Sequence, residues 1–271
     1  MIVSEHEYFR EGGIFHGFVP LVMGTRLEVL LTGVAENVCG TLWECMCGTA
    51  GRLQSMMNRF DPESEVSRIN AAGKSVLSTG MSGIISVCEH FRKSTGGLFD
   101  IGRGTVDWEN ALDENRSIIN LHGGNLDFGG IGKGYLLKKY RKMLLDAGVA
   151  TAYIDFGGSS IMALGHHPYG KCWKVGVTDP FSGALIREVE LVDMSMSTSG
   201  NQPGYEGHIT DPRNGLPVTG RRLVTILSPD PLTAEIASTA AMIADEEDIA
   251  FIKENNEIAE ILGLASTSYG N

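Results

Sequence analysis

The residues from 125 to 135 have the types and the spacing of a phosphate-binding turn. This segment contains one carboxylate, four glycines and one lysine, and we expect it where a strand passes into a helix. Glycine allows the backbone to approach a bulky ligand closely. The first turn of a helix adds N–H groups without intrahelical partners and a partial positive charge. The segment is therefore predicted to hold a phosphorylated ligand.

Two common phosphate fingerprints do not fit this segment. The dinucleotide pattern needs a third glycine where Tyr135 stands, and the P-loop needs Ser or Thr after its lysine, whereas Gly134 follows Lys133. Read as Asp-x-Gly-Gly-x-x-Lys-Gly-Tyr, the segment is similar to the loop of the ApbE-type flavin transferases. Enzymes of that family take FAD and attach its FMN part to a hydroxyl of another protein.

Further blocks of this family's pattern occur in the expected order, between about residue 22 and residue 245. They are residues 22–25, 60–70, 97–101, 155–158, 197–200, 208–215 and 234–240. We call residues 125–135 the glycine turn. Seven ordered blocks in addition to the glycine turn make a chance match a poor explanation. The resemblance to the ApbE-type flavin transferases thus covers most of the chain.

Breaking the diphosphate of FAD requires charge neutralisation, for which Mg²⁺ is suited because a hard cation binds oxygen ligands. Glu235 and Thr239 stand four residues apart on an expected helix, so both oxygens share one face. Spacing alone favours a simpler interpretation, an acid near a helix N-terminus and a packed threonine. The resemblance instead implies that Glu235, Thr239 and an oxygen of Gly130 hold the metal. Glu235 replaces the family's Asp, which lengthens the arm by one methylene.

The resemblance also implies which residues contact FAD. Asp127 is expected to accept hydrogen bonds from FAD, Lys133 to lie beside it, and Thr198 to line the phosphate or the acceptor entry. The expected flavin or adenine contacts are Met23, Phe60, Leu98, Phe99 and Asp100. Structural alternatives remain open, because Asp127 suits a turn and Lys133 a solvated helix position. Phe60, where relatives often have Tyr, and Leu98 are equally suited to a core.

His208 is the expected catalytic residue, because it is the only histidine within a family block and imidazole exchanges protons near neutrality. The alternative is that His208 only positions phosphate or flavin. Residues 211–215, Asp-Pro-Arg-Asn-Gly, have the composition of a tight turn. The primary role expected for Asp211 is therefore to form this turn. Asn214 replaces the family's usual Thr.

These residues need elements to position them, and the apolar spacing predicts both helices and strands. Helices are expected at residues 36–57, 80–92, 133–147 and from about 231 onward, and strands at 25–31, 151–155, 172–178, 186–191 and 223–227. Strand runs beside helix runs indicate an α+β fold of mixed, largely antiparallel sheets flanked by helices, related by the resemblance to the T-fold. Residues 1–271 show no linker or repeat, so we expect a single domain.

Composition narrows the partners and the compartment. The chain has 271 residues, of which 42% are hydrophobic, enough for a sizeable core. Its net charge of −11 argues against nucleic acid as a partner, so an anionic ligand must be held by local groups. An acidic N-terminus, no transmembrane segment and five cysteines favour the cytoplasm. A leader already removed from an exported protein is the alternative.

The expected function is Mg²⁺-dependent FAD:protein FMN transfer to a Thr or Ser of a target flavoprotein, with release of AMP. One alternative is an FAD pyrophosphatase, in which water replaces the hydroxyl. A second alternative, from another class, is a flavin-binding protein without turnover. A homodimer is left open as the assembly state.

Overall fold

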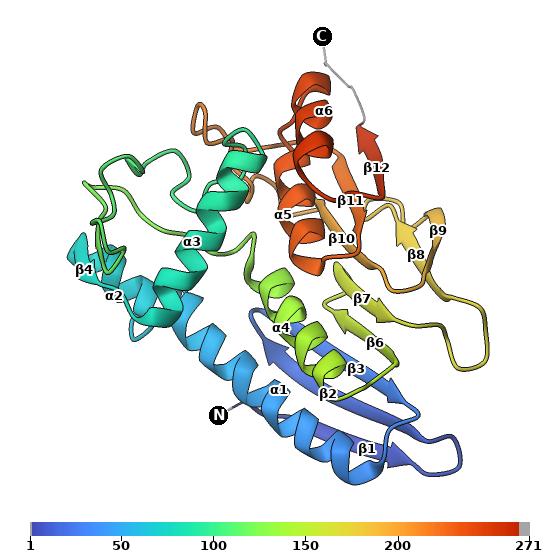
Figure 1. The fold of residues 1–271 in the computed structure, drawn as a ribbon. Coiled ribbons are helices and arrows are strands. Elements are labelled where there is room, and N and C mark those ends of the chain that lie inside the picture. Colours follow the sequence, from blue (N-terminus) through green and yellow to red (C-terminus); the bar gives the residue numbers. More distant parts are fainter. Residues whose placement is uncertain (1, 266–271) are drawn as a thin grey trace.

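The computed structural model describes residues 2–265 and is built around an eight-stranded sheet (Figure 1). The strand order is β1-β2-β3-β6-β7-β10-β11-β12, and each neighbouring pair is antiparallel. The strands of this sheet are β1 (Glu5–Phe9), β2 (Ile14–Val22), β3 (Thr25–Thr32), β6 (Thr151–Phe156), β7 (Ser160–Leu164), β10 (Ser195–Gly200), β11 (Arg222–Ser228) and β12 (Glu260–Ala265). The predicted α+β class with largely antiparallel sheets is confirmed.

Two small antiparallel sheets and six helices complete the described part of the chain. The small sheets pair β4 (Lys74–Val76) with β5 (Ile118–Asn120), and β8 (Trp173–Thr178) with β9 (Leu185–Leu191). The helices are α1 (Glu36–Met57), α2 (Glu65–Ala72), α3 (Thr79–Ser94), α4 (Gly132–Asp146), α5 (Pro231–Ala241) and α6 (Glu246–Asn255). In Figure 1, α1 and α4 lie across the sheet, and α5 lies beside β10 and β11.

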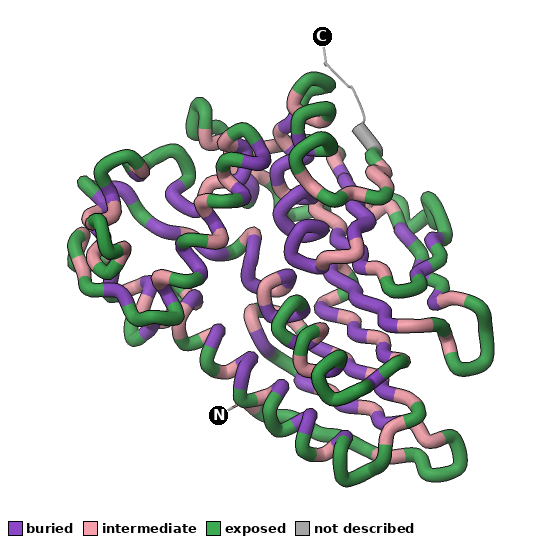
Figure 2. The backbone as a smooth tube through the Cα atoms, in the orientation of Figure 1, coloured by how far each residue is buried: buried purple, intermediate pink, exposed green. Residues whose placement is uncertain are grey.

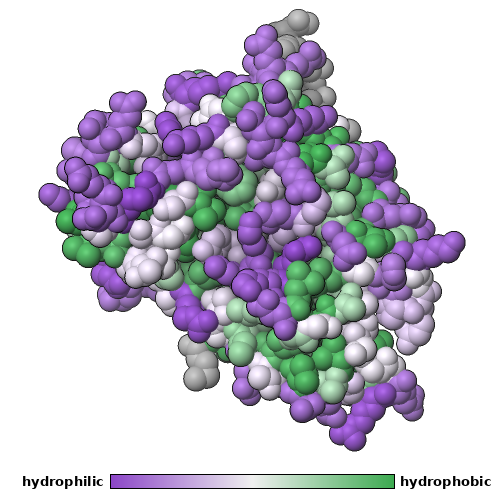
Figure 3. All heavy atoms as spheres, in the orientation of Figure 1, coloured by the Kyte–Doolittle hydropathy of each residue, from purple (hydrophilic) through white to green (hydrophobic). Residues whose placement is uncertain are grey.

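The sheet separates two hydrophobic clusters. Strand β6 alternates between buried and half-buried residues, and its buried members join the larger cluster with α1 and α4. Strand β7 is buried along its whole length, because Met162 faces the helices while Ile161 packs with the β8–β9 hairpin. Figure 2 shows the resulting purple band of buried backbone through the sheet and α5. Figure 3 shows mostly hydrophilic side chains on the visible surface, with smaller apolar areas between them.

Most predicted elements are confirmed, but the glycine segment differs from expectation in one respect. Strand β5 ends at Asn120, and residues 121–131 form turns and irregular backbone before α4 begins at Gly132. The expected strand-to-helix junction is therefore wrong on its strand side. Leu126 and Phe128 are both buried, so these two side chains, and not strand pairing, anchor the loop to the core.

All five cysteines, which lie within residues 2–265, have free thiols. In the same part of the chain no helix has the length and apolarity needed to span a bilayer.

Candidate functional site

Two glycines one turn apart bring the start of α4 against α5. A Cβ added to Gly134 would lie 2.7 Å from the Cβ of Glu235 and 2.8 Å from the carbonyl oxygen of Pro231. A Cβ added to Gly130 would lie 3.4 Å from Oγ1 of Thr239. Only glycine permits such close approach at Gly134, so the backbone of the glycine turn packs directly against the residues of α5. The three residues predicted to hold a metal, Gly130, Glu235 and Thr239, are brought together.

Glu235 is a buried carboxylate, with 2% of its surface exposed. Its Oε1 accepts a hydrogen bond from Nζ of Lys133 at 3.0 Å, and its Oε2 accepts one from Oγ of Ser160 at 2.8 Å. A charge this deeply buried needs a partner, and Lys133 supplies it from the first turn of α4. The solvated position considered for Lys133 is therefore wrong, since its side chain is only 23% exposed.

The side chains around Glu235 fit a hard divalent cation such as Mg²⁺. The hydroxyl of Thr239 donates to the carbonyl of Glu235 at 3.2 Å and lies 3.5 Å from Oγ of Ser199. The donors gathered here are oxygens, which are the ligands that Mg²⁺ prefers. Within residues 2–265 no group of three or more His, Cys, Asp or Glu is placed to hold a metal. A cation at this site would therefore combine the Glu235 carboxylate with hydroxyl and carbonyl oxygens.

The start of α4 presents free hydrogen-bond donors. Oδ1 of Asp127 accepts the N–H of Gly129 at 2.9 Å and so closes the glycine turn from within. The helix has Ile131 at its N-cap, without a side-chain cap. In the described part of the chain, the N–H groups of Lys133 and Gly134 make no hydrogen bond to a backbone carbonyl in the turn that precedes α4. Such donors at a helix N-terminus suit an anion.

His208 lies on an exposed loop near this turn, and its ring stacks on Tyr205 with the centroids 4.5 Å apart. Partial burial of the imidazole lowers its pKa below the ordinary 6.5, and the charge of Lys133 lowers the pKa further. Both effects favour the neutral form of the imidazole. A neutral ring can accept a proton, as the predicted role of His208 requires.

The tight turn predicted at residues 211–215 is confirmed. Oδ1 of Asp211 accepts the backbone N–H of Arg213 at 2.9 Å, and the carbonyl of Asp211 accepts the N–H of Gly215 at 2.8 Å. The guanidinium of Arg213 binds both oxygens of Asp211 and reaches Asp248 of α6 at 3.0 Å. These bonds lower the pKa of Asp211 and anchor the His208 loop on α6.

Three of the predicted FAD contacts serve a loop or the core in this structure. The carboxylate of Asp100 accepts from the N–H of Gly102, the N–H of Gly104 and Nε1 of Trp108, at 2.8, 2.9 and 2.9 Å. Leu98 and Phe99 are 2% and 4% exposed. Leu98 is therefore a core residue, while the ring of Phe99 lies 3.5 Å from where a Cβ on Gly130 would be and so borders the site.

Met23 lies at the edge of the glycine turn, and Phe60 is connected to the turn through Arg59, which contacts both Phe60 and Asp127. Sδ of Met23 lies 3.3 Å from where a Cβ on Gly132 would be, and Met23 itself adopts a φ of 48°. Its N–H donates to Oε1 of Gln54 at 2.7 Å. Phe60 is 80% exposed, so the alternative of a core position for it is wrong.

Thr198 is not brought to the site. Its hydroxyl pairs with that of Thr225 on β11 at 2.8 Å, whereas Ser199 pairs with Ser238 of α5 at 2.8 Å. Successive side chains of a strand point to opposite faces of a sheet. The hydroxyl of Thr198 therefore points away from α5, Ser197 and Ser199 are the β10 residues that face α5, and the expected contact of Thr198 with the phosphate or the acceptor stays a prediction.

Two arginines missed by the sequence analysis flank Asp127. Nε of Arg59 lies 3.3 Å, and Nη1 of Arg103 lies 3.6 Å, from the same oxygen, Oδ2. Arg59 directly precedes the block that begins at Phe60, and Arg103 stands between two glycines. A cation inside a Gly-x-Gly run is a signal that could have drawn attention to Arg103.

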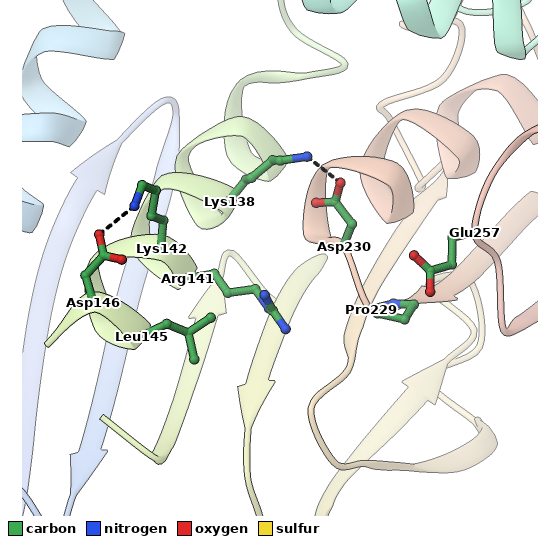
Figure 4. Close-up of a pocket in the computed structure, with 8 residues that line it drawn as sticks. All are labelled: Lys138, Arg141, Lys142, Leu145, Asp146, Pro229, Asp230 and Glu257. Atoms are coloured by element: carbon green, nitrogen blue, oxygen red, sulfur yellow. Dashed lines mark hydrogen bonds and ion pairs between the residues drawn. The ribbon is translucent and has the colours of Figure 1, made fainter. Parts of the chain in front are cut away.

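A separate hollow of about 480 Å³ lies on the outer side of α4, and Figure 4 shows the residues around it. Two ion pairs hold four of its charged groups, since Lys138 pairs with Asp230 at 2.6 Å and Lys142 with Asp146 at 2.7 Å. None of the residues predicted for the flavin or the metal lines this hollow. The candidate site is the junction of the glycine turn with α5.

The model of the ApbE family matches residues 23–113 and 103–262. The chain belongs to the ApbE family. It is 34% identical to an FAD:protein FMN transferase of Rhodobacter capsulatus over 131 residues, 45% of this chain and 25% of that protein. It is 32% identical to one of Klebsiella pneumoniae (strain 342) over 171 residues, 54% of this chain and 52% of the relative. The matches thus span about a quarter to a half of these relatives' lengths.

A solved ApbE structure has the same fold. The flavin transferase ApbE from Vibrio cholerae superposes with a TM-score of 0.74 over 99% of both chains, at 19% identity. The family resemblance predicted from the ordered blocks is confirmed by the family model.

Proposed function

We propose that the chain is an FAD:protein FMN transferase that moves the FMN part of FAD to a Thr or Ser hydroxyl of a target flavoprotein and releases AMP. One observation carries the proposal. Gly130 and Gly134 of the glycine turn meet Glu235 and Thr239 of α5, in a chain of the ApbE family. Curated relatives of this family bear the name FAD:protein FMN transferase.

FAD would bind with its diphosphate at the start of α4. The free N–H groups of Lys133 and Gly134 and the positive end of the helix favour an anion there. Met23 borders the same turn and Phe60 lies near it through Arg59, and both would offer apolar surface to the rings of FAD. Asp127 holds the turn in shape through Gly129.

Glu235, Thr239 and the carbonyl oxygen of Gly130 would hold Mg²⁺. The ion would neutralise charge on the diphosphate and help to orient it. Lys133 balances the charge of Glu235 in the protein alone, at 3.0 Å. Ser160 fixes the other carboxylate oxygen and so limits the directions in which Glu235 can point.

His208 would take the proton of the acceptor. The hydroxyl oxygen attacks the phosphorus on the FMN side, the bond from that phosphorus to the bridging oxygen breaks, and AMP leaves with the electron pair. The hydroxyl proton would pass to the imidazole, whose lowered pKa favours the neutral form that accepts a proton. The products are the FMN phosphoester of the acceptor and AMP.

The test is an assay of AMP from FAD and Mg²⁺, with and without an acceptor domain that presents Thr or Ser. AMP that forms only with acceptor, together with an acceptor heavier by the mass of FMN less water, supports the transferase. AMP formed equally without acceptor identifies a pyrophosphatase. FAD binding without AMP in either arm identifies a binding protein. Arg187→Gln, at an ion pair on the β9–β12 surface, is a matched control that should behave as the parent chain.

Three further expectations accompany this function. The free thiols support a reducing compartment, and the cytoplasm is proposed on that ground. Residues 1–271 are proposed to unfold as one domain, which a single calorimetric transition would support. The homodimer stays a prediction for light scattering to decide.

A further inference from the structure

We infer that Arg59 and Arg103 form a cationic clamp for the diphosphate of the flavin substrate, an inference that rests on the proposed function. The two guanidinium groups come from distant parts of the chain, the end of α1 and the loop after α3. They converge on one oxygen of Asp127, at 3.3 and 3.6 Å. We refer to these three residues as the arginine clamp.

The three side chains of the arginine clamp carry a net positive charge. Oδ1 of Asp127 is committed to the N–H of Gly129, and its Oδ2 faces both guanidinium groups. One carboxylate therefore balances two cations, which leaves one positive charge in a chain of net charge −11. Both distances exceed the roughly 2.7–2.9 Å of a strong charged N–H···O bond. Each guanidinium has five N–H donors, so most of them stay available to a ligand.

Arg103 is held in an unusual position. Its φ is 52°, in the left-handed region that residues with a side chain rarely adopt. The carboxylate of Asp100 fixes the loop through the N–H groups of Gly102 and Gly104. A Cβ on Gly104 would come 2.1 Å from the carbonyl oxygen of Pro212, so the loop is seated directly on the tight turn. Strain of this kind concentrates at functional positions.

This position makes Arg103 a bridge between two parts of the site. Its Nη1 faces Asp127 beside the glycine turn, and its Nη2 donates to Oγ1 of Thr210 at 2.5 Å. Thr210 is two residues from His208. A phosphate placed between the glycine turn and the imidazole would therefore lie within reach of this guanidinium group.

Arg59 approaches from the turn that follows α1. Its Cζ lies 4.4 Å from the centroid of the Phe60 ring, so the guanidinium packs against an aromatic face. The side chain of Arg59 is 44% exposed and that of Asp127 is 21% exposed. Stacking fixes the plane of the guanidinium group while its edge, which carries the N–H donors, stays open to a ligand.

The test compares three flavins that differ in phosphate number. Dissociation constants of FAD, FMN and riboflavin are measured by flavin fluorescence in EDTA, so that no metal contributes. The variants are Arg59→Gln, Arg103→Asn and the double variant, because Asn tolerates the left-handed backbone at residue 103. Arg187→Gln, which breaks an ion pair with Glu260 on the sheet surface, is the matched control.

Each single substitution should weaken FAD about 10- to 100-fold, the range expected for a lost charge-assisted contact. FMN should weaken less than FAD, and riboflavin should change less than about twofold. The salt dependence of FAD binding should also become shallower in the double variant. Equal weakening of FAD and riboflavin, or unchanged FAD affinity in a variant with an unchanged melting temperature, would overturn the clamp. A parent chain that binds no flavin would instead overturn the proposed function.

Discussion

Nζ of Lys133 lies 3.0 Å from Oε1 of Glu235, so the ammonium group of the glycine turn neutralises the carboxylate at the proposed metal site. Ser160 completes the environment of Glu235, whose surface is 2% exposed. A divalent cation on this carboxylate would take over the role of the ammonium group. Lys133 would then be released toward the phosphate that binds at the same helix start. Metal binding and flavin binding would thereby be linked through one side chain.

Glu235→Gln keeps the shape of the side chain and removes its charge. We expect Mg²⁺ to improve FAD affinity at least about tenfold in the parent chain, about 1.4 kcal/mol, and to have no effect in this variant. Titration calorimetry of FAD with Mg²⁺ and with EDTA measures the difference. Glu235→Asp is the control, because it keeps a carboxylate and should retain a Mg²⁺ effect. An undiminished effect in the Gln variant would show that the ion binds elsewhere.

Lys133→Met removes the partner of a buried carboxylate while retaining an unbranched side chain. The free energy of unfolding should fall by about 1–3 kcal/mol, since Glu235 keeps only Ser160. Mg²⁺ should restore part of this loss, because it replaces the missing positive charge. Melting temperatures across a Mg²⁺ titration, without FAD, provide the readout. If Mg²⁺ raises the melting temperature equally in the variant and the parent, exchange between ammonium and metal is ruled out.

Gly134→Ala tests the contact between α4 and α5. The added methyl would lie 2.7 Å from the Cβ of Glu235 and 2.8 Å from the carbonyl oxygen of Pro231, so the helices must separate. We expect a loss of about 1–3 kcal/mol in urea denaturation, as for overpacked interiors. Gly40→Ala, within α1 and with open space around it, is the opposite case and should stabilise by about 0.5–1 kcal/mol. Equal effects at both positions would contradict the packing described.

His208 should titrate below pH 6.5, because burial and Lys133 both lower its pKa. Protonation removes the base, so transfer should weaken as the pH falls through that pKa. An NMR titration of the imidazole reports the value directly, and Lys133→Gln should raise it. For the chemistry, His208→Gln should slow AMP release at least about 100-fold and leave FAD affinity nearly unchanged. A proportional loss of FAD affinity would instead indicate that His208 only positions the ligand.

Asp211 should stabilise the protein in a pH-dependent way. Hydrogen bonds from Arg213 lower its folded-state pKa below 3.8, so the contribution is present above that pH and is lost as the pH falls through the folded pKa. Asp211→Asn should lower the free energy of unfolding by about 1–2 kcal/mol at pH 7. The expected loss is no larger because Arg213 is half-exposed and solvent screens its ion pair. The difference from the parent should shrink below about pH 4. Denaturant midpoints at several pH values check this, and a constant difference would contradict it.

The sequence predicted those elements whose apolar spacing matches their burial. Helix α1 spans Glu36–Met57, as expected, because Leu42, Met46 and Leu53 all face the core. Strand β10 is visible in the sequence only as a family block, because its inward positions carry serine hydroxyls that bond to α5. A polar strand of this kind has no hydrophobic alternation to detect.

The site was predicted in part for a related reason. Motif order identified Gly130, Glu235 and Thr239, and the fold brings them together. The partner of Glu235 was not foreseen, because Lys133 is 102 residues away and only tertiary packing decides the contact. The contacts of the arginine clamp depend on tertiary packing in the same way, and the two-residue alternation of β10 places the hydroxyl of Thr198 on the face opposite α5.

The pairing of β3 with β6 joins Leu27 to Phe156 and encloses α1 through α4 in one long closed segment. Pairing across such a sequence separation is slow, since the entropy of closing the segment is lost before any bond forms. We therefore expect helix content to return early on dilution from urea, and competence to capture flavin to return in a later kinetic phase.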